Sequence, residues 1–556
     1  MNRKKCILIN LKADKYNMKT APQALAKLGG ILLKRERWEV KYLDEQIMPI
    51  NNLLSIIQEL QPDFIGISSQ AGTVNSLWKV LKQISEVFIK IPIFIGNITA
   101  TYGYKSILKK YPQVFCSIGR GERTFWKIAE IIEENQFNKN VHCIPNIAYV
   151  SQKTGKIIVN NYAYSCGDEI ECLSDWEGVF RDSPVDNYEE FWLEFSHGCP
   201  RKANNIGCIY CAIMPDGESR KWHPRNINNV IQDYMALVSK GVKHIKFSDE
   251  EFLSNSPERI IELANAIHGI NKKIYTEKGI HITFDFSARV DDIVRLNKYN
   301  YKNSNGNQNL NCLNALKEAG LLQIYLGLES GNDAQLKRMK KGVNVSDNYE
   351  AIKILKQLHI RIAGGWIMFD PFMKNPKELL HNSKFLKQAG LIPHSVTDDF
   401  VTNTTGQMRV LVGSPLVGML DEVGLLRKLN DNLIEYDFDY IDPVIYDIVK
   451  KIEEWETIKD KKLMYRAKSI ISLLGDNCDC GLTYNEQISL TNAFFDIKLL
   501  DLQMCDELSK QAIAKNNGSP SRYSLSFNKE LLNKHEVAVK KIYRILKGMS
   551  DNCKSI

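Results

Sequence analysis

Short apolar runs alternate with amphipathic segments in two separate blocks of this sequence, and this alternation restricts the possible fold more than any other feature. In the first block, runs such as KCILIN, DFIGISS and IPIFIGN are each followed by a segment with helical periodicity. Strands that alternate with helices predict a parallel, doubly wound sheet that binds ligands at the carboxyl ends of its strands. We therefore expect an α/β protein whose N-terminal domain covers residues 1–135.

The second block begins at FWLEFSHG and continues through KHIKFSD, HITFDFSAR, LQIYLGLES and RIAGGWIMF. This pattern predicts a partial (β/α) barrel over residues 191–400, with its active site at the carboxyl ends of the strands. Residues 136–190 are expected to form a linker that contains a hairpin, and residues 401–556 a mainly helical C-terminal domain. The polar run at 297–311 predicts a surface loop. A chain of 556 residues is too long for one core, which agrees with several domains.

Composition excludes some classes of function. The net charge of +8 comes from 73 Lys+Arg against 65 Asp+Glu and is not gathered into a basic stripe, so we expect no nucleic-acid partner. The apolar run near the N-terminus is too short for a signal peptide, and no run of eighteen apolar residues occurs, so we expect a cytoplasmic protein without a membrane partner. Thirteen cysteines in a reducing compartment favour free thiols and metal ligands over disulfides.

Three cysteines lie together in the stretch HGCPRKANNIGCIYCAI, which follows the first predicted barrel strand: Cys199, Cys208 and Cys211. Structural zinc sites normally have four protein ligands, and His197 is a candidate for the fourth. Three thiolates suit a 4Fe–4S cluster that keeps one iron open. A zinc site, a redox pair and structural thiols remain alternatives at this point.

The cysteine spacing C-x8-C-x2-C, with Tyr210 before the last ligand, resembles the radical S-adenosylmethionine (radical SAM) superfamily. The commonest spacing there is C-x3-C-x2-C, so this chain has five extra residues in the first gap. Four later stretches resemble the family in the same order: FSDEEF, DFSARVDDI, AGLLQIYLGLESGNDAQLKRMKKGVN and IAGGWIMFDP. The resemblance implies a 4Fe–4S cluster on the three cysteines. It also implies a set of residues that bind S-adenosylmethionine: Tyr210, Asp249, Glu250, Ser287, Arg289, Glu329, Ser330, Gly364, Gly365 and Ile367.

The resemblance also implies a role for each stretch. Asp249 and Glu250 are placed at the methionine amino group, and Arg289 with Ser287 near its carboxylate. The Glu329–Ser330 pair is placed near the ribose. The Gly364–Gly365 pair would allow close backbone approach, and Ile367 with Tyr210 would contact adenine. Each stretch also has a structural interpretation: a solvated helix cap for the acidic residues, a surface ion pair for the arginine, and a barrel bulge for the glycine pair.

The first block resembles the cobalamin-binding domain that precedes many radical SAM barrels, through PDFIGISSQAGT, IPIFIGNITATY and VFCSIGRGERTF. A corrin with a nucleotide tail needs small residues at the strand ends. The resemblance implies the cobalamin-binding residues Gly66, Ser68, Ser69, Gly72, Thr73, Gly96, Asn97, Gly119, Gly121 and Glu122. Asn97 stands where a second glycine is usual, and Arg120 and Arg123 stand where acidic residues are common. No D-x-H-x-x-G motif occurs, so no histidine axial ligand is expected. Ordinary βα turns, or a domain that has lost cobalamin, are the alternatives.

The combination implies an enzyme that reductively cleaves S-adenosylmethionine to a 5′-deoxyadenosyl radical and modifies an unactivated carbon. C-methylation in natural-product or peptide biosynthesis is the expected outcome. The expected partners are a small-molecule or peptide substrate and a flavodoxin- or ferredoxin-type electron donor. Alternatives are a radical SAM dehydratase, epimerase, cyclase or rearrangement enzyme with or without cobalamin, a tRNA-modifying enzyme, and a non-enzymatic metal-binding regulator. Three residues after the barrel are either structural or face the substrate: Arg409, Ser414 and Pro415. Cys478 and Cys480 are a further candidate cluster pair.

Overall fold

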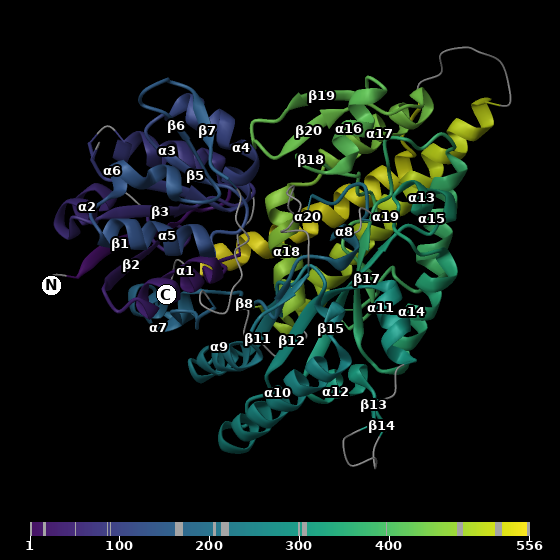
Figure 1. Cartoon of the computed structure of the whole chain (residues 1–556). Helices are drawn as coiled ribbons and strands as arrows, with labels where there is room; N and C mark the ends of the chain where they lie inside the picture. The colour runs from purple at the N-terminus through teal and green to yellow at the C-terminus, as the bar shows by residue number, and fades with distance from the viewer. Residues whose placement is uncertain are drawn as a thin grey trace.

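The structure is a computed structural model, and Figure 1 shows its N-terminal domain beside the barrel. A C-terminal helix, Tyr484–Asn516, packs against the barrel helix Lys377–Gln388. Cys478 and Cys480 lie outside the described residues. The residues that the structure describes are 3–14, 18–49, 52–85, 87–88, 90–161, 171–203, 207–212, 222–298, 301–302, 309–395, 397–474, 482–516 and 525–552.

The N-terminal domain is built on a seven-stranded sheet with the order β2-β1-β3-β4-β5-β6-β7. The strands are β1 (Lys4–Asn10), β2 (Trp38–Asp44), β3 (Phe64–Ser68), β4 (Ile93–Gly96), β5 (Phe115–Ser117), β6 (Ile147–Val150) and β7 (Ile157–Val159). The first five are parallel, as predicted. The strand order reverses between β1 and β3, which places a ligand-binding switch point at their carboxyl ends.

Helices cover both faces of this sheet. They are α1 (Gln23–Lys34), α2 (Leu53–Leu60), α3 (Val74–Ser85), α4 (Asn97–Lys110) and α5 (Glu122–Glu133), with the short α6 (Phe137–Asn140) after them. Side chains alternate along β1, so that Leu8 joins the core under α1 and α5. Ile7 and Ile9 join the core under α2, α3 and α4.

The hairpin expected between the two domains is present and extends the N-terminal sheet. Strand β6 pairs antiparallel with β5, and β7 pairs antiparallel with β6. Helix α7 (Trp176–Asp182) then packs against β2 and α1. The side chains of Trp176 and Phe180 belong to one buried cluster that continues from the α1 and α5 face into the barrel. The two domains therefore share a continuous core.

The second domain is a partial barrel of six parallel strands in the order β17-β16-β15-β12-β11-β8, as predicted. The strands are β8 (Trp192–Leu193), β11 (His244–Phe247), β12 (Thr283–Arg289), β15 (Leu321–Glu329), β16 (Arg361–Trp366) and β17 (Phe400–Val401). The helices are α8 (Pro200–Ala203), α9 (Ile227–Ser239), α10 (Pro257–Lys278), α11 (Val290–Asn297), α12 (Cys312–Glu318), α13 (Asp333–Arg338), α14 (Val345–Gln357) and α15 (Lys377–Gln388). Short pairs are β9 (Ser196–His197) with β10 (His223–Pro224) and β13 (Tyr301–Lys302) with β14 (Asn309–Leu310).

The C-terminal region is mainly helical, but it opens with a small antiparallel sheet that the sequence did not indicate. Its strands, β18 (Val410–Leu411), β19 (Leu426–Leu429) and β20 (Glu435–Phe438), run in the order β18-β20-β19. Its helices are α16 (Pro415–Glu422), α17 (Pro443–Glu456), α18 (Lys461–Leu474), α19 (Tyr484–Asn516) and α20 (Lys529–Asn552). Helix α19 packs against α15, α17 and α20. No helix in the described ranges combines the length and apolarity that crossing a membrane requires.

Candidate functional site

The three cysteines lie where β9 ends and in the loop that follows α8. Cys208 is buried, whereas Cys199 and Cys211 are partly exposed. The backbone N–H of Cys211 donates to the carbonyl of Cys208 at 3.3 Å. Arg289, the last residue of β12, places its Nη1 3.6 Å from the Sγ of Cys208. A cation at this place would face the negative charge of a sulfur that ligates a metal.

The donor set tests whether the cysteine loop fits an iron–sulfur cluster. Three soft thiols within residues 199–211, one of them beside a cation, match the ligands that such clusters use. Within the described ranges no three His, Cys, Asp or Glu side chains, the three cysteines included, lie close enough together to hold a single metal ion. His197 is buried in β9 and stacks on His223 with 5.5 Å between ring centroids. Burial and the nearby Arg120 lower the pKa of His197 to about 3.

Asp249 and Glu250, predicted at the methionine amino group, hold the backbone that leads to the cluster loop. Asp249 accepts from the N–H of Phe195 at 2.9 Å, the N–H of Ser196 at 2.6 Å and the hydroxyl of Ser196 at 2.5 Å. Glu250 accepts from the N–H of Gly198 at 3.0 Å, directly before the first cysteine. The structure thus gives both carboxylates a positioning role, and contact with the amino group stays a prediction.

Two residues beyond the predicted set, Glu251 and Lys341, contact Arg289, and Lys341 joins it to Glu329. The backbone N–H of Arg289 donates to Glu251 at 3.3 Å, and its Nη2 donates to the carbonyl of Lys341 at 2.6 Å. Lys341 pairs with Glu329 at 2.9 Å. Burial, together with the negative charge of the nearby Asp292, raises the pKa of Glu251 to about 8. Glu251 is the third acidic residue of FSDEEF, and Lys341 lies within RMKKGVN. Both residues therefore belong to motifs from which they could have been predicted as site residues.

The remaining predicted residues separate into two groups. Tyr210 and Ile367, both predicted at adenine, pack against one small hydrophobic cluster that contains Ile209 and Met339, so the fold brings them together. Ser330 is fully buried and its hydroxyl lies 2.7 Å from the Gln335 side-chain oxygen and 2.9 Å from that of Asn382. The structure therefore places Ser330 inside a packing network and not in an open ribose site.

The glycine pair lies on β16 and Ser287 on β12, the two strands that flank β15. A Cβ atom at Gly364 would stand 3.0 Å from Leu328 and Val401 side-chain atoms, and one at Gly365 would stand 3.0 Å from the hydroxyl of Tyr325. Tyr325 is also the strand neighbour of Ser287. Gly364 is thus required by packing, whereas Gly365 leaves room for Tyr325.

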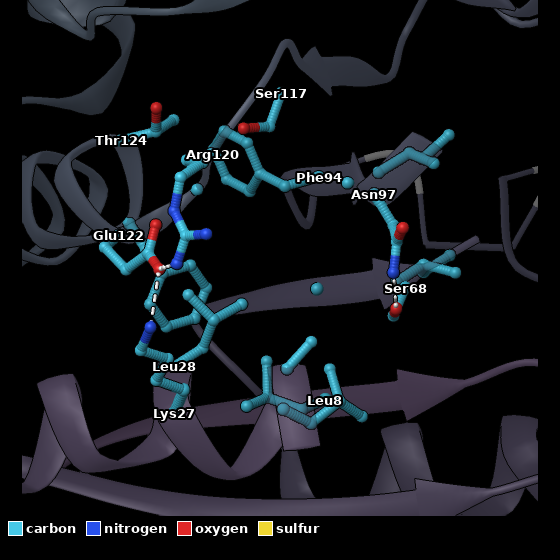
Figure 2. A pocket seen from close by; sticks show the side chains of 18 of the residues that line it. Leu8, Lys27, Leu28, Ser68, Phe94, Asn97, Ser117, Arg120, Glu122 and Thr124 are labelled. Carbon is cyan, nitrogen blue, oxygen red and sulfur yellow. Dashed lines mark hydrogen bonds and ion pairs between the residues drawn. The ribbon is translucent and has the colours of Figure 1, made fainter. Parts of the chain in front are cut away.

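A cavity of about 350 Å³ lies at the carboxyl ends of β3 and β4, beside the switch point of the N-terminal sheet. Of the predicted cobalamin-binding residues it is lined by Gly66, Ser68, Gly96, Asn97, Gly119, Gly121 and Glu122. Figure 2 shows Arg120 and Glu122 on one side of it, Asn97 and Ser68 on the opposite side, and Leu8 below.

Ser69, Gly72 and Thr73 do not line this cavity. The Ser69 and Thr73 hydroxyls are fully buried and lie 2.8 Å from each other. Thr73 also donates to the carbonyl of Gln70 at 2.9 Å. These residues shape the loop after β3, in which Gly72 has a φ of 82°. Their predicted contact with cobalamin stays a prediction, since none of the three lies in the cavity wall.

The cavity fits a bulky group with apolar faces and a few hydrogen-bonding edges. A Cβ atom at Gly96 would meet nothing within 4 Å, and one at Gly121 would meet nothing closer than 3.9 Å, so both glycines leave open space. Phe94 contributes an apolar wall. Within the described ranges the Ser117 hydroxyl and one Glu122 oxygen are buried without a hydrogen-bond partner. The corrinoid tail implied by the sequence resemblance has this character.

An ionic network forms the wall of the cavity that faces the barrel. Arg120 donates to both oxygens of Glu194, at 2.8 and 3.0 Å, and to Glu122 at 2.6 Å. Lys27 of α1 contacts the same two carboxylates, at 2.5 Å to Glu194 and 3.2 Å to Glu122. Burial alone would raise the pKa of Glu122, but the two cations hold it well below its usual value. Because Glu194 lies just before β9, this network joins the cavity to the barrel.

The three residues noted after the barrel have structural partners. Arg409 is exposed and pairs with Glu435 of β20. Ser414 precedes α16 and donates to the carbonyl of Leu411 at 2.8 Å. Pro415 is the first residue of α16, a position that suits its fixed φ. These contacts favour the structural interpretation of all three.

Two family models match separate parts of the chain. Residues 193–381 match the model of the Radical SAM superfamily, and residues 17–129 match that of the B12 binding domain. The sequence is 25% identical over 399 residues to 4′-phospho-dehydrooxetanocin synthase from Priestia megaterium. That alignment covers 69% of this chain and 50% of the relative, so the chain spans about half the length of this curated relative.

Two solved structures share the fold. OxsB, a cobalamin-dependent S-adenosylmethionine radical enzyme with aqua-cobalamin and S-adenosylmethionine bound, matches with a TM-score of 0.75 at 18% identity, covering 100% of this chain and 81% of that one. TsrM, a radical S-adenosylmethionine methyltransferase from Kitasatospora setae with cobalamin and a [4Fe-4S] cluster bound, matches with a TM-score of 0.59 at 12% identity, covering 93% and 100%. At these identities the likeness is one of fold.

Proposed function

This chain is a radical SAM enzyme whose barrel follows a B12 binding domain, and we propose that it uses its cobalamin to methylate an unactivated carbon of a natural product or peptide. One observation carries the proposal: the cavity of the B12 binding domain and the cysteine loop adjoin. Glu194 lines the cavity, and Cys199 follows it by five residues. A methyl donor and a carbon activated at the barrel would then stand near one another.

The bound cofactors would supply reductive cleavage of S-adenosylmethionine, abstraction of a hydrogen atom and a transferable methyl group. The chain would contribute the holding and orienting groups. Cys199, Cys208 and Cys211 would ligate the cluster, with the Arg289 guanidinium beside the sulfur of Cys208. Asp249 would fix the backbone that presents the first of these ligands.

Support for methylation over other outcomes comes from one structural neighbour, TsrM, which is a methyltransferase. A second candidate is a ring-forming or rearranging reaction, since the relative from Priestia megaterium is named a synthase and not a methyltransferase. Both candidates need a small-molecule or peptide substrate and an electron donor of the flavodoxin or ferredoxin type. The two differ in whether a methyl group of S-adenosylmethionine reaches the product.

The test is anaerobic reconstitution of the full chain with iron, sulfide and hydroxocobalamin. We expect cluster absorbance, bound corrinoid, and formation of 5′-deoxyadenosine from S-adenosylmethionine and dithionite. The variant Cys208→Ala should lose the cluster and this cleavage, whereas Cys143→Ala, an exposed cysteine remote from the barrel strands, should keep both. Retention of cleavage by Cys208→Ala would contradict the proposal.

A second experiment distinguishes methylation from rearrangement by following the methyl group of S-adenosylmethionine. S-adenosylmethionine with a trideuterated methyl group is supplied to cells that express the gene, and their metabolites are compared with cells that express the Cys208→Ala variant. A product that gains the label only with the active chain supports methylation. A product that depends on the active chain but carries no label supports the rearrangement instead.

A further inference from the structure

The loop that carries Cys208 and Cys211 is held from three directions. From the barrel, the carbonyl of Met339 accepts from the N–H of Ile209 at 3.1 Å. From the C-terminal region, the N–H of Leu416 donates to the carbonyl of Ile209 at 3.0 Å. From the N-terminal domain, the hydroxyl of Tyr102 on α4 donates to the carbonyl of Ala212, the residue directly after Cys211. Each of the three parts of the chain thus contributes at least one contact to the loop.

The Tyr102 side chain is held in place by the C-terminal region. Gly413, whose φ is 82°, lies so close that a Cβ atom there would stand 2.7 Å from the tyrosine ring. The next residue of α4, Gly103, packs in the same way against Leu433, whose side chain would stand 2.9 Å from a Cβ atom. Leu433 lies in the turn between β19 and β20 and is part of the N-terminal core. Because the ring is packed this closely, a shift of α4 would displace the Tyr102 hydroxyl and would not be absorbed by a rotation of the side chain.

The other end of the same helix lines the cavity of the B12 binding domain. Asn97, the first residue of α4, has a φ of 73° and donates to the Ser68 hydroxyl at 3.2 Å. Thr101, one turn on, accepts from the N–H of Gly119 at 3.0 Å. Asn97, Ser68 and Gly119 all line the cavity. Five residues, about 7.5 Å of helix, separate Asn97 from Tyr102.

We propose that Tyr102 is a positioning residue that couples the corrinoid cavity to the cluster loop. A ligand in the cavity fixes the first turn of α4, and a fixed α4 sets the position of the Ala212 carbonyl next to Cys211. Coupling between two binding sites is reciprocal. If the bound corrinoid raises the affinity for the cluster by some factor, the bound cluster raises the affinity for the corrinoid by the same factor. This inference rests on the proposed function, since it needs both cofactor sites.

The test compares Tyr102→Phe with Tyr104→Phe, a matched control on the same helix whose ring packs against the N-terminal core. Each full-length protein is titrated with hydroxocobalamin, before and after anaerobic reconstitution with iron and sulfide, and binding is followed by absorbance. In the wild type and Tyr104→Phe, the reconstituted form should bind roughly fivefold more tightly, the size expected for one hydrogen bond. In Tyr102→Phe the two forms should bind equally.

A second readout is the electron paramagnetic resonance spectrum of the reduced cluster. It should change on addition of hydroxocobalamin in the wild type and in Tyr104→Phe, but not in Tyr102→Phe, a difference that a purely structural role would not produce. The inference is overturned if Tyr102→Phe keeps the wild-type difference, or if the wild type shows none. A wild-type chain that binds neither iron nor corrinoid would overturn the proposed function together with this inference.

Discussion

The carboxylate of Asp249 accepts hydrogen bonds from both the backbone N–H and the hydroxyl of Ser196, at 2.6 and 2.5 Å. Asp249 follows β11, and Ser196 begins β9, which ends two residues before the first cysteine, so this contact fixes where the cluster loop departs from the barrel. A third bond reaches the N–H of Phe195. The acidic motif of this chain therefore shapes the loop before any cofactor binds.

We expect Asp249→Ala to destabilise the loop strongly, because it leaves two buried N–H groups unpaired at about 1–3 kcal/mol each. Iron bound after reconstitution should fall well below the wild-type level, and the thermal midpoint should drop. Asp249→Asn, which keeps one acceptor oxygen, should give an intermediate result. Wild-type iron content in Asp249→Ala would show that the loop does not depend on this carboxylate.

Gly96 offers a way to close the cavity without disturbing the fold. A side chain there meets nothing within 4 Å, and the residue has extended backbone angles, so Gly96→Val should keep the wild-type thermal midpoint. It should nevertheless lose bound hydroxocobalamin, measured as corrinoid per chain after gel filtration. Gly269→Val, also in open space but on α10, is the control and should bind normally.

The contrasting substitution is Gly66→Val. A Cβ atom at Gly66 would lie 2.8 Å from a side-chain atom of Leu8, so this variant should lose both corrinoid and stability. Unchanged corrinoid binding in Gly96→Val would place the ligand elsewhere. Comparison of the Gly96→Val and Gly66→Val variants therefore distinguishes a filled cavity from a destabilised fold.

The ion pair between Arg120 and Glu194 should contribute both to the stability of the chain and to corrinoid binding, because it joins the cavity wall to the barrel. Removing one partner of a buried ion pair typically costs on the order of 3 kcal/mol. Here Lys27 still faces Glu194, and Glu122 still faces Arg120, so each single variant should lose part of this amount. Arg120→Gln and Glu194→Gln should each lower the thermal midpoint and shorten the retention of hydroxocobalamin. The double variant should be less impaired than the sum of the two single variants. Additive effects would mean that the two side chains act independently.

Lys498 should make stability depend on pH above neutrality. Its Nζ donates to the carbonyls of Val401 and Thr402, at 2.8 and 2.9 Å, and caps β17 from α19. Burial, aided by Lys468, lowers its pKa from 10.5 to about 7. Below pH 7 Lys498 is charged in both the folded and the unfolded state, so burial of the charge lowers the free energy of unfolding by its full amount. This loss of stability becomes smaller as the pH rises from about 7 toward 10.5, the pKa of lysine in the unfolded chain.

The measurement compares Lys498→Met with the wild type between pH 6 and pH 9. The variant lacks both hydrogen bonds at every pH, whereas the wild type carries the cost of the buried charge mainly at the lower end. The difference in thermal midpoint in favour of the wild type should therefore widen as pH rises. A difference that stays constant or narrows would contradict the lowered pKa.

Local patterns determined much of this protein. The alternation of apolar runs and amphipathic segments specified both parallel sheets, since each strand and helix follows from the period of its own side chains. The cysteine spacing and the small residues after β3, β4 and β5 indicated both cofactor sites. Neighbouring residues suffice for such signals, because a loop at a strand end places its residues at one edge of the sheet whatever lies elsewhere in the chain.

Contacts between distant segments were decided only by the tertiary structure. No sequence pattern indicates that Asp249 bonds Ser196, that Arg120 meets Glu194 across a domain boundary, or that Tyr102 reaches Ala212. The same holds for Ser330, whose motif resembles a ribose site but whose hydroxyl is taken up by Gln335 and Asn382. The physical reason is that a polar side chain, once buried, must bond whatever partner packing brings near, and packing is a property of the whole chain.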